Sequence, residues 1–77
     1  MARLQYFVVT YKDQWWVNFQ GNRYGPYGTQ AEAIEAAKES ARKSAEQGYP
    51  SQVLVQGRDG KFRVEWTYGD DPYPPKG

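Results

Sequence analysis

Two residue types that carry much of enzyme and metal chemistry are missing from this chain of 77 residues, which has no cysteine and no histidine. Without cysteine, disulfides and thiolate zinc sites are excluded, and a reducing cytoplasm is the expected setting. Without histidine, Ser-His and Cys-His dyads and imidazole metal ligands are excluded as well. We therefore expect a protein that is not an enzyme and that binds neither a metal nor a cofactor.

Long apolar runs and a strong net charge are missing too. The apolar run at residues 6–9 is too short for a signal peptide, and no stretch reaches the roughly 20 residues that span a bilayer. The net charge of +1 falls far short of the dense Lys/Arg stripe of a dedicated nucleic-acid binder. We expect one soluble cytoplasmic domain, near the lower size limit for folding without disulfides, bound metals or oligomerisation.

What the first third of the chain does contain is the pattern of a β-hairpin. Residues 6–11 and 15–20 are rich in β-branched and aromatic side chains, and the polar residues 12–14 separate them. No Asn-Gly or Asp-Gly pair fixes the turn, so two registers remain open. Residues 23–24 are a candidate for a short third strand, and residues 25–28 are predicted to form the turn that ends it.

Residues 30–47 predict a single helix. Thr29 and Glu32 fit a capping box, in which the Thr29 hydroxyl accepts from the Glu32 amide and the Glu32 carboxylate accepts from the Thr29 amide. Gly48 stands where a glycine commonly follows a helix end, and Pro50 prevents continuation. The stripe predicted to face the sheet carries Ile34, Ala37, Ala41 and Ala45.

Residues 52–56 and 61–68 predict two more strands, joined by a turn at residues 57–60 in which Gly60 takes a positive φ. The side chains predicted to share one buried face of the last strand are Phe62, Val64, Trp66 and Tyr68. The expected fold is α+β: a small antiparallel sheet of four to five strands (β-β-(β)-α-β-β) with one amphipathic helix packed on one face. Residues 1–69 make this domain, and residues 70–77 are a Pro-rich tail that is either docked or disordered.

Several segments resemble a known family. They are the helix start Thr29-Gln-Ala-Glu-Ala-Ile-Glu-Ala-Ala-Lys38, the turn Gly57-Arg-Asp-Gly-Lys61, the ending Tyr68-Gly-Asp-Asp-Pro-Tyr-Pro-Pro-Lys-Gly77 and the pair Trp15-x-Val17. Over nearly its whole length the chain resembles the small prokaryotic family called domain of unknown function 2188. It departs from that pattern at Gln14, where the family usually has glycine, and in the insertion-like residues 47–50. The resemblance implies a fold and no activity, since the family has no assigned function.

Two adjacent tryptophans, Trp15 and Trp16, lie in the second predicted strand, so their indoles point to opposite faces of the sheet. Trp15 shares its face with Val17 and Phe19 and is predicted to be core. Trp16 shares the mixed face with Asn18 and Gln20 and is predicted to lie on the open side. The two hairpin registers place different neighbours beside Trp16, either Phe7, Val9 and Tyr11 or Tyr6, Val8 and Thr10.

This open side is the candidate interaction surface. Its predicted residues are Trp16, Asn18, Gln20, Tyr11, Arg63 and Lys61, with Arg58 as a turn residue that could contact phosphate. An alternative is that the tail covers Trp16 through Tyr73, Pro74 and Pro75, because a Tyr-Pro-Pro segment stacks well on an indole.

Two functional hypotheses follow from this surface. In the first, a protein partner or a second copy of the chain binds through the open face or an edge strand. In the alternative, Trp16, its aromatic neighbours and strand Arg/Lys bind nucleic acid weakly and largely without sequence preference.

Overall fold

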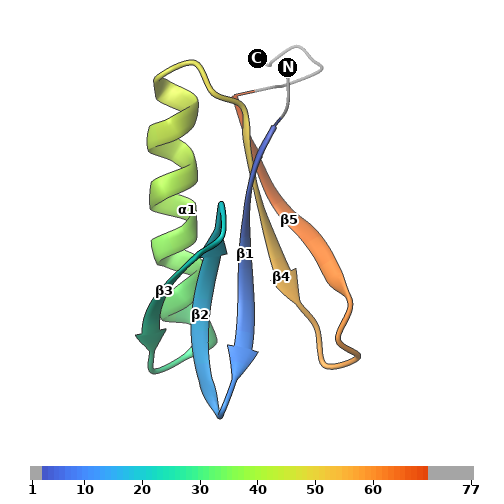
Figure 1. Ribbon diagram of the computed structural model, residues 1–77. Coiled ribbons are helices and arrows are strands. Elements are labelled where there is room, and N and C mark those ends of the chain that lie inside the picture. The colour runs from blue at the N-terminus through green and yellow to red at the C-terminus, as the bar shows by residue number, and fades with distance from the viewer. Residues whose placement is uncertain (1–2, 70–77) are drawn as a thin grey trace.

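The structure is a computed structural model that describes residues 3–69. Its elements are β1 (Leu4–Tyr11), β2 (Gln14–Phe19), β3 (Asn22–Tyr27), α1 (Gln30–Glu46), β4 (Ser51–Gln56) and β5 (Phe62–Tyr68). The strands form one sheet in the order β3-β2-β1-β4-β5, and α1 lies across one face of it (Figure 1). The α+β class and the element order are as predicted.

Two tight turns join the first three strands. Tyr11 pairs with Gln14, so only Lys12 and Asp13 form the first loop, and both have positive φ, 54° and 64°. Phe19 pairs with Asn22 across a second two-residue loop, in which Gln20 and Gly21 have φ of 50° and 82°. Positive φ at both central residues is the type I′ geometry, whose twist matches that of the flanking strands. The first turn selects the register in which Val9 pairs with Trp16.

Both ends of α1 are capped within a few residues of the predicted positions. The Thr29 hydroxyl accepts from the Glu32 amide at 3.1 Å, as expected. The Glu32 carboxylate accepts from the Gly28 amide at 3.0 Å, and not from the Thr29 amide as predicted. At the other end the helix stops at Glu46, Gly48 has φ 97°, and the Gly48 and Tyr49 amides donate to the carbonyls of Ala45 and Ser44. These two bonds form a Schellman motif.

Alanines make the contact between α1 and the sheet. Ala33, Ala37 and Ala41 are fully buried, while Ile34 and Ala45 are half-buried. Ala33 was missing from the predicted stripe. The sheet side chains that form the core with these alanines are Tyr6, Val8, Val17, Val53 and Val55. Small helix side chains let the helix axis approach the sheet closely, so the strands supply most of the core volume.

The sheet is mixed, and the prediction of a fully antiparallel sheet is wrong. β1 and β4 are neighbours at its centre and run parallel, with Leu4 beside Ser51 and Val8 beside Val55. The chain reaches β4 through α1, which returns it to the end of the sheet where β1 began. Parallel neighbours need such a crossover. The Leu4 amide donates to the Pro50 carbonyl at 2.8 Å and holds the two strand starts together.

The face assignment of the last strand is also wrong, because β5 contains a bulge. Val53 pairs with Trp66 and Leu54 with Val64, so Glu65 is an extra residue on β5. The bulge reverses the alternation. Trp66 packs against the helix-side core, whereas Val64, opposite Leu54, lies on the other face.

The predicted turn at residues 25–28 is mostly strand. β3 continues to Tyr27, and its pairing with β2 shifts between Trp15 and Val17. Pro26 is tolerated because β3 is an edge strand. Gly25 has φ 130°, and a Cβ there would lie 3.2 Å from the Trp15 carbonyl oxygen and 3.3 Å from the Trp16 ring. The backbone of β3 therefore passes directly beside the Trp16 indole.

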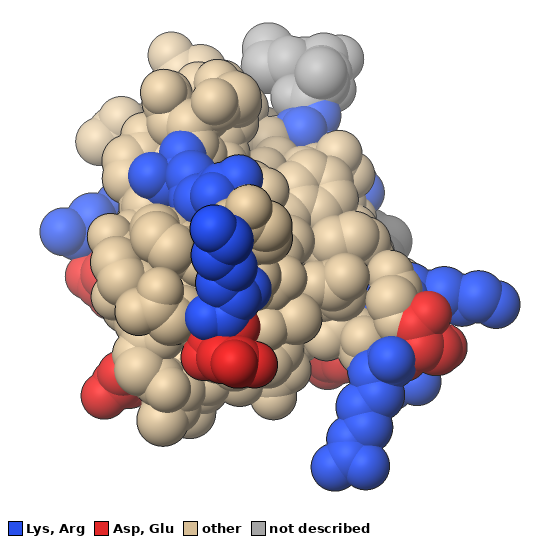
Figure 2. All heavy atoms as spheres, turned by 60° about the horizontal axis from the view of Figure 1, so that its bottom comes forward, with Lys and Arg blue, Asp and Glu red and all other residues tan. Residues whose placement is uncertain are grey.

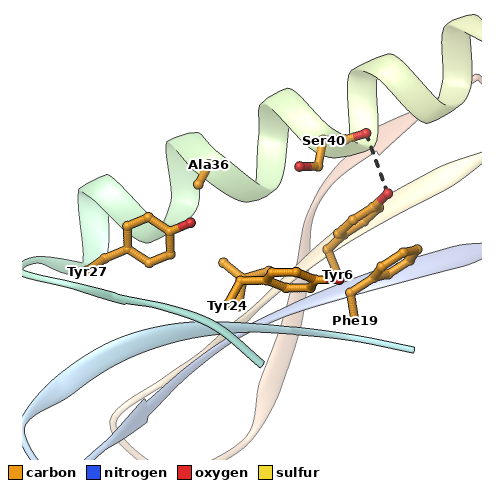
Figure 3. Close-up of a pocket in the computed structure, with 7 residues that line it drawn as sticks. Tyr6, Phe19, Tyr24, Tyr27, Ala36 and Ser40 are labelled. Atoms are coloured by element: carbon orange, nitrogen blue, oxygen red, sulfur yellow. Dashed lines mark hydrogen bonds between the residues drawn. The ribbon is translucent and has the colours of Figure 1, made fainter. Parts of the chain in front are cut away.

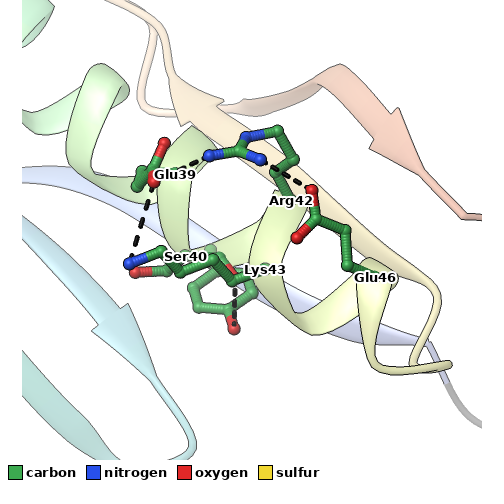
Figure 4. A network of polar contacts seen from close by, with 6 residues as sticks. Glu39, Ser40, Arg42, Lys43 and Glu46 are labelled. Atoms are coloured by element: carbon green, nitrogen blue, oxygen red, sulfur yellow. Dashed lines mark hydrogen bonds and ion pairs between the residues drawn. The ribbon is translucent and has the colours of Figure 1, made fainter.

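The outer side of α1 carries a network of ion pairs (Figure 4). The Arg42 guanidinium lies 2.7 Å from the carboxylates of both Glu39 and Glu46, and the Lys43 ammonium lies 3.8 Å from Glu39. The hydrogen bond from Arg42 and its charge lower the pKa of the Glu39 carboxyl. All four side chains are exposed, so the network adds little stability. It marks this side of the helix as the solvated one.

Replacing Gln20 by Asn tests the second turn. Asn adopts positive φ more readily than Gln, and Asn-Gly is the preferred type I′ pair, so we expect Gln20→Asn to raise the free energy of unfolding by about 0.5 kcal/mol. Urea denaturation measures the change. The control is Gln14→Asn, the same change at an extended position in β2, which should not stabilise. A stabilisation shared by both variants would contradict the turn geometry.

Candidate functional site

One face of the sheet has no helix over it in the part of the chain that the structure describes, and we call it the open face. Apolar side chains run across its middle from β2 to β5. We name this set the open-face cluster: Phe7, Val9, Trp16, Leu54, Phe62 and Val64. The cross-strand pairs Val9–Trp16, Phe7–Leu54 and Leu54–Val64 connect its members.

The open-face cluster is partly packed and partly exposed. Leu54 is only 9% exposed although no described helix covers it. The rings of Phe7 and Phe62 meet edge to face, with centroids 5.3 Å apart and planes at 83°. Phe62 and Val64 remain 41% and 50% exposed. The cluster therefore buries its own centre and leaves its β5 side open to a further molecule.

Next to the cluster, an arginine lies against two aromatic rings. Arg23 on β3 places its guanidinium carbon 5.4 Å from the Trp16 ring centroid and 5.0 Å from that of Tyr11. The indole N–H of Trp16 donates to the Tyr11 carbonyl at 3.3 Å. Lys12 adds a second cation 5.5 Å from the Tyr11 ring. We call Tyr11, Trp16 and Arg23 the aromatic–arginine group.

Asn18 also lies on the open face, between Phe7 on β1 and Arg23 on β3. Its side-chain oxygen is buried and has no hydrogen-bond partner within residues 3–69. An unpaired buried acceptor is costly, so a donor placed there would be favoured.

The remaining predicted site residues lie elsewhere. Gln20 is in the β2–β3 turn, and Lys61 precedes β5. The prediction that Arg63 flanks the open face is wrong, because Arg63 pairs with the core residue Val55 and so shares the helix side. Arg63 and Arg58 both border a hollow of about 820 Å³ on that side. Tyr73, Pro74 and Pro75 are outside the described residues.

Sequence reasoning found Trp16, Tyr11 and Asn18 on this face, with Phe7 and Val9 beside them in one of its two registers. It left out Leu54, Phe62 and Val64. Leu54 carried a usable signal, since it alternates with Val53 and Val55 and must oppose them on a strand. Phe62 and Val64 carried a misleading one, because the bulge at Glu65 separates them from Trp66 and Tyr68.

A hollow on the helix side separates α1 from the edge formed by β2 and β3 (Figure 3). Its volume is about 320 Å³, and the aromatic side chains around it are Tyr6, Phe19, Tyr24 and Tyr27. Tyr6 stacks on Phe19 with ring centroids 4.1 Å apart, and its hydroxyl lies 2.8 Å from the Ser44 hydroxyl. Helix residues Ala36 and Ser40 are too small to fill the gap. The hollow therefore results from the small side chains that α1 carries on this side.

The charges at one end of the sheet do not form a single patch. Figure 2 shows the end of the sheet at the β1–β2 and β4–β5 turns, where basic side chains stand in separate groups with acidic ones beside them. Within residues 3–69 no group of three or more carboxylates could hold a metal ion. The helix in that range is neither long nor apolar enough to cross a membrane. The open face is thus the most distinctive surface of the described chain.

The two tryptophans should differ in their effect on stability. Trp15 packs against the helix-side core, whereas Trp16 lies on the open face. We expect Trp15→Ala to lower the free energy of unfolding by about 3 kcal/mol and Trp16→Ala by about 1.5 kcal/mol or less. Chemical denaturation followed by circular dichroism measures both. Equal large losses would contradict the assignment of the two indoles to opposite faces.

Comparison with known proteins connects this fold to a family. A family model described as "Uncharacterized protein conserved in bacteria" matches residues 6–68, from β1 to the end of β5. No curated protein and no solved structure matches the chain. Because the family model spans every strand and the helix, the chain belongs to the bacterial family DUF2188.

Proposed function

We propose that this domain is a small non-enzymatic binding module that holds a protein partner, or a second copy of itself, on its open face. The observation that carries the proposal is the open-face cluster, an apolar strip across a sheet face with no described helix over it. Continuous apolar surface of this kind is typical of interaction sites. The lack of cysteine and histidine in the sequence also argues against catalysis and fits a cytoplasmic setting.

The composition of the open face supports a protein ligand. Trp, Tyr and Arg dominate the binding energy of protein interfaces, and the aromatic–arginine group supplies one of each. The Trp16 indole is held in place by its bond to the Tyr11 carbonyl and by the Arg23 guanidinium against its ring. A preorganised anchor loses less entropy on binding.

Binding through the open face is tested by comparing truncations of two aromatic side chains. Trp16→Ala removes an open-face anchor, whereas Tyr49→Ala removes a 51% exposed ring in the loop after α1. Proteins retained from a bacterial lysate by the wild type are identified by mass spectrometry, purified and titrated. We expect Trp16→Ala to weaken binding at least about 10-fold, the scale of an interface hot spot, and Tyr49→Ala to change it less than about twofold.

A partner that binds both variants as tightly as the wild type would contradict the proposal. The lysate experiment alone decides nothing, because only the titration of a purified partner assigns the contact to a face.

A second candidate is weak nucleic-acid binding at the aromatic–arginine group. The observation that favours it is Arg23 lying against two rings, with Lys12 close by. Exposed rings stack on bases of any sequence, and the cations would contact phosphates. The low net charge limits this mode to weak binding.

Salt dependence tests the nucleic-acid candidate. For a fluorescent single-stranded oligonucleotide, two or three phosphate contacts predict that log K falls against log salt with a slope of about −2. Arg23→Ala should weaken binding by roughly 10-fold, and Arg42→Ala on the outer side of α1 should not. Anisotropy titrations measure both. Absence of binding at low salt would remove this candidate and leave the protein-binding proposal standing.

A further inference from the structure

The hollow between α1 and the β2–β3 edge, which we call the aromatic hollow, is lined mainly by rings. The aromatic residues that border it are Tyr6, Phe19, Tyr24 and Tyr27. Small-molecule sites in proteins have volumes of about 300–1,000 Å³ and are lined mainly by apolar and aromatic side chains with a few polar groups. At about 320 Å³, the aromatic hollow has the size and the lining of such a site.

One wall of the aromatic hollow is held rigidly. Tyr6 is only 4% exposed, and its ring stacks on Phe19 with planes at 5° to each other. Its hydroxyl lies 2.8 Å from the Ser44 hydroxyl and donates to the Ser40 carbonyl at 3.5 Å. A wall that is fixed before binding loses little entropy when a ligand packs against it.

The opposite wall is made of small side chains. Ala36 and Ser40 lie one helical turn apart on α1, and Figure 3 shows them on the helix side of the hollow, with the rings on the strand side. Tyr24, on the edge strand β3, is 47% exposed. The space is therefore open to solvent at the β3 edge, where a ligand can enter.

The lining specifies the chemistry of the ligand. None of the residues that border the aromatic hollow is charged, so a phosphate or carboxylate would lose hydration there without gaining an ion pair. Aromatic walls favour a flat ring. The hydroxyls of Tyr24 and Tyr27 have no hydrogen-bond partner within residues 3–69, so they can bind one polar group of the ligand. An engineered protein cavity of about 150 Å³ holds benzene, and twice that volume has room for two fused rings.

We propose that the aromatic hollow binds a small, neutral aromatic molecule of one or two rings that carries a hydrogen-bonding group. Indole represents this class. The site lies on the helix side of the sheet, opposite the open face, so the inference goes beyond the proposed function and does not depend on it.

Titration of the full chain with indole, followed by NMR, tests the site. We expect saturable shifts with a Kd of about 1 mM or below, and nuclear Overhauser contacts between indole and the Ala36 methyl. Ala36→Leu places a larger side chain in the hollow and should weaken binding at least about 10-fold. The control is Ala31→Leu, the same change at an exposed position in the first turn of α1, which should alter the Kd less than about twofold.

A second variant tests the site from the strand side. Tyr24→Ala removes an exposed ring from the lining and should weaken indole binding about fivefold, whereas Tyr49→Ala, which removes a 51% exposed ring elsewhere, should not. Circular dichroism checks that every variant folds. Tetramethylammonium, a cation that aromatic cages also bind, should bind at least about 10-fold more weakly than indole.

The inference is wrong if indole gives no saturable shifts up to about 5 mM, or if folded Ala36→Leu and Tyr24→Ala bind it as the wild type does. Indole binding that is weakened by Trp16→Ala and not by Ala36→Leu would place the probe on the open face and overturn the site. Tighter binding of tetramethylammonium than of indole would overturn the ligand class. None of these results changes the outcome expected for a protein partner on the open face.

Discussion

The contact between three alanines of α1 and the sheet determines the arrangement of the whole molecule. Ala33, Ala37 and Ala41 are fully buried against a sheet side made largely of Tyr and Val. Because these side chains are small, one helix of 17 residues can lie close to the sheet and exclude water from its central strands. The same helix returns the chain to the start of β1 and so makes the β1–β4 pair parallel. Its narrow apolar stripe also leaves the hollow beside Tyr24 and Tyr27 unfilled.

Within residues 3–69 a single helix covers only one side of the five strands, so in that part of the chain the open face is stabilised by its own side chains. The edge-to-face pair Phe7–Phe62 and the burial of Leu54 provide a second, thinner apolar layer there. On β5 this layer leaves Phe62 and Val64 exposed to solvent. Toward the β3 edge of the sheet, the Trp16 ring of the aromatic–arginine group lies beside Gly25. Because Gly25 has no side chain, nothing at that position crowds the ring. The proposed binding face therefore follows from how little of the sheet the helix covers.

Local patterns predicted the local features. The Thr29 cap, the Gly48 helix end and the opposite faces of Trp15 and Trp16 depend on residues close in sequence, and the structure confirms each. The parallel β1–β4 pair joins residues about 47 apart, and no strand pattern encodes its direction. The bulge at Glu65 depends on how β5 fits β4, so regular alternation wrongly placed Phe62 and Val64 in the core. Arg63 was misplaced with them.

The division of the sheet into a helix-covered face and a self-packed open face is tested most directly by nuclear Overhauser contacts of three β4 side chains. We predict that the methyls of Val53 and Val55 show contacts with Ala37 and its neighbours on α1. We predict that the Leu54 methyls show contacts with Phe7 and Val64 and none with the helix alanines. Contacts between Leu54 and the helix alanines, or between Phe62 and α1, would contradict the account.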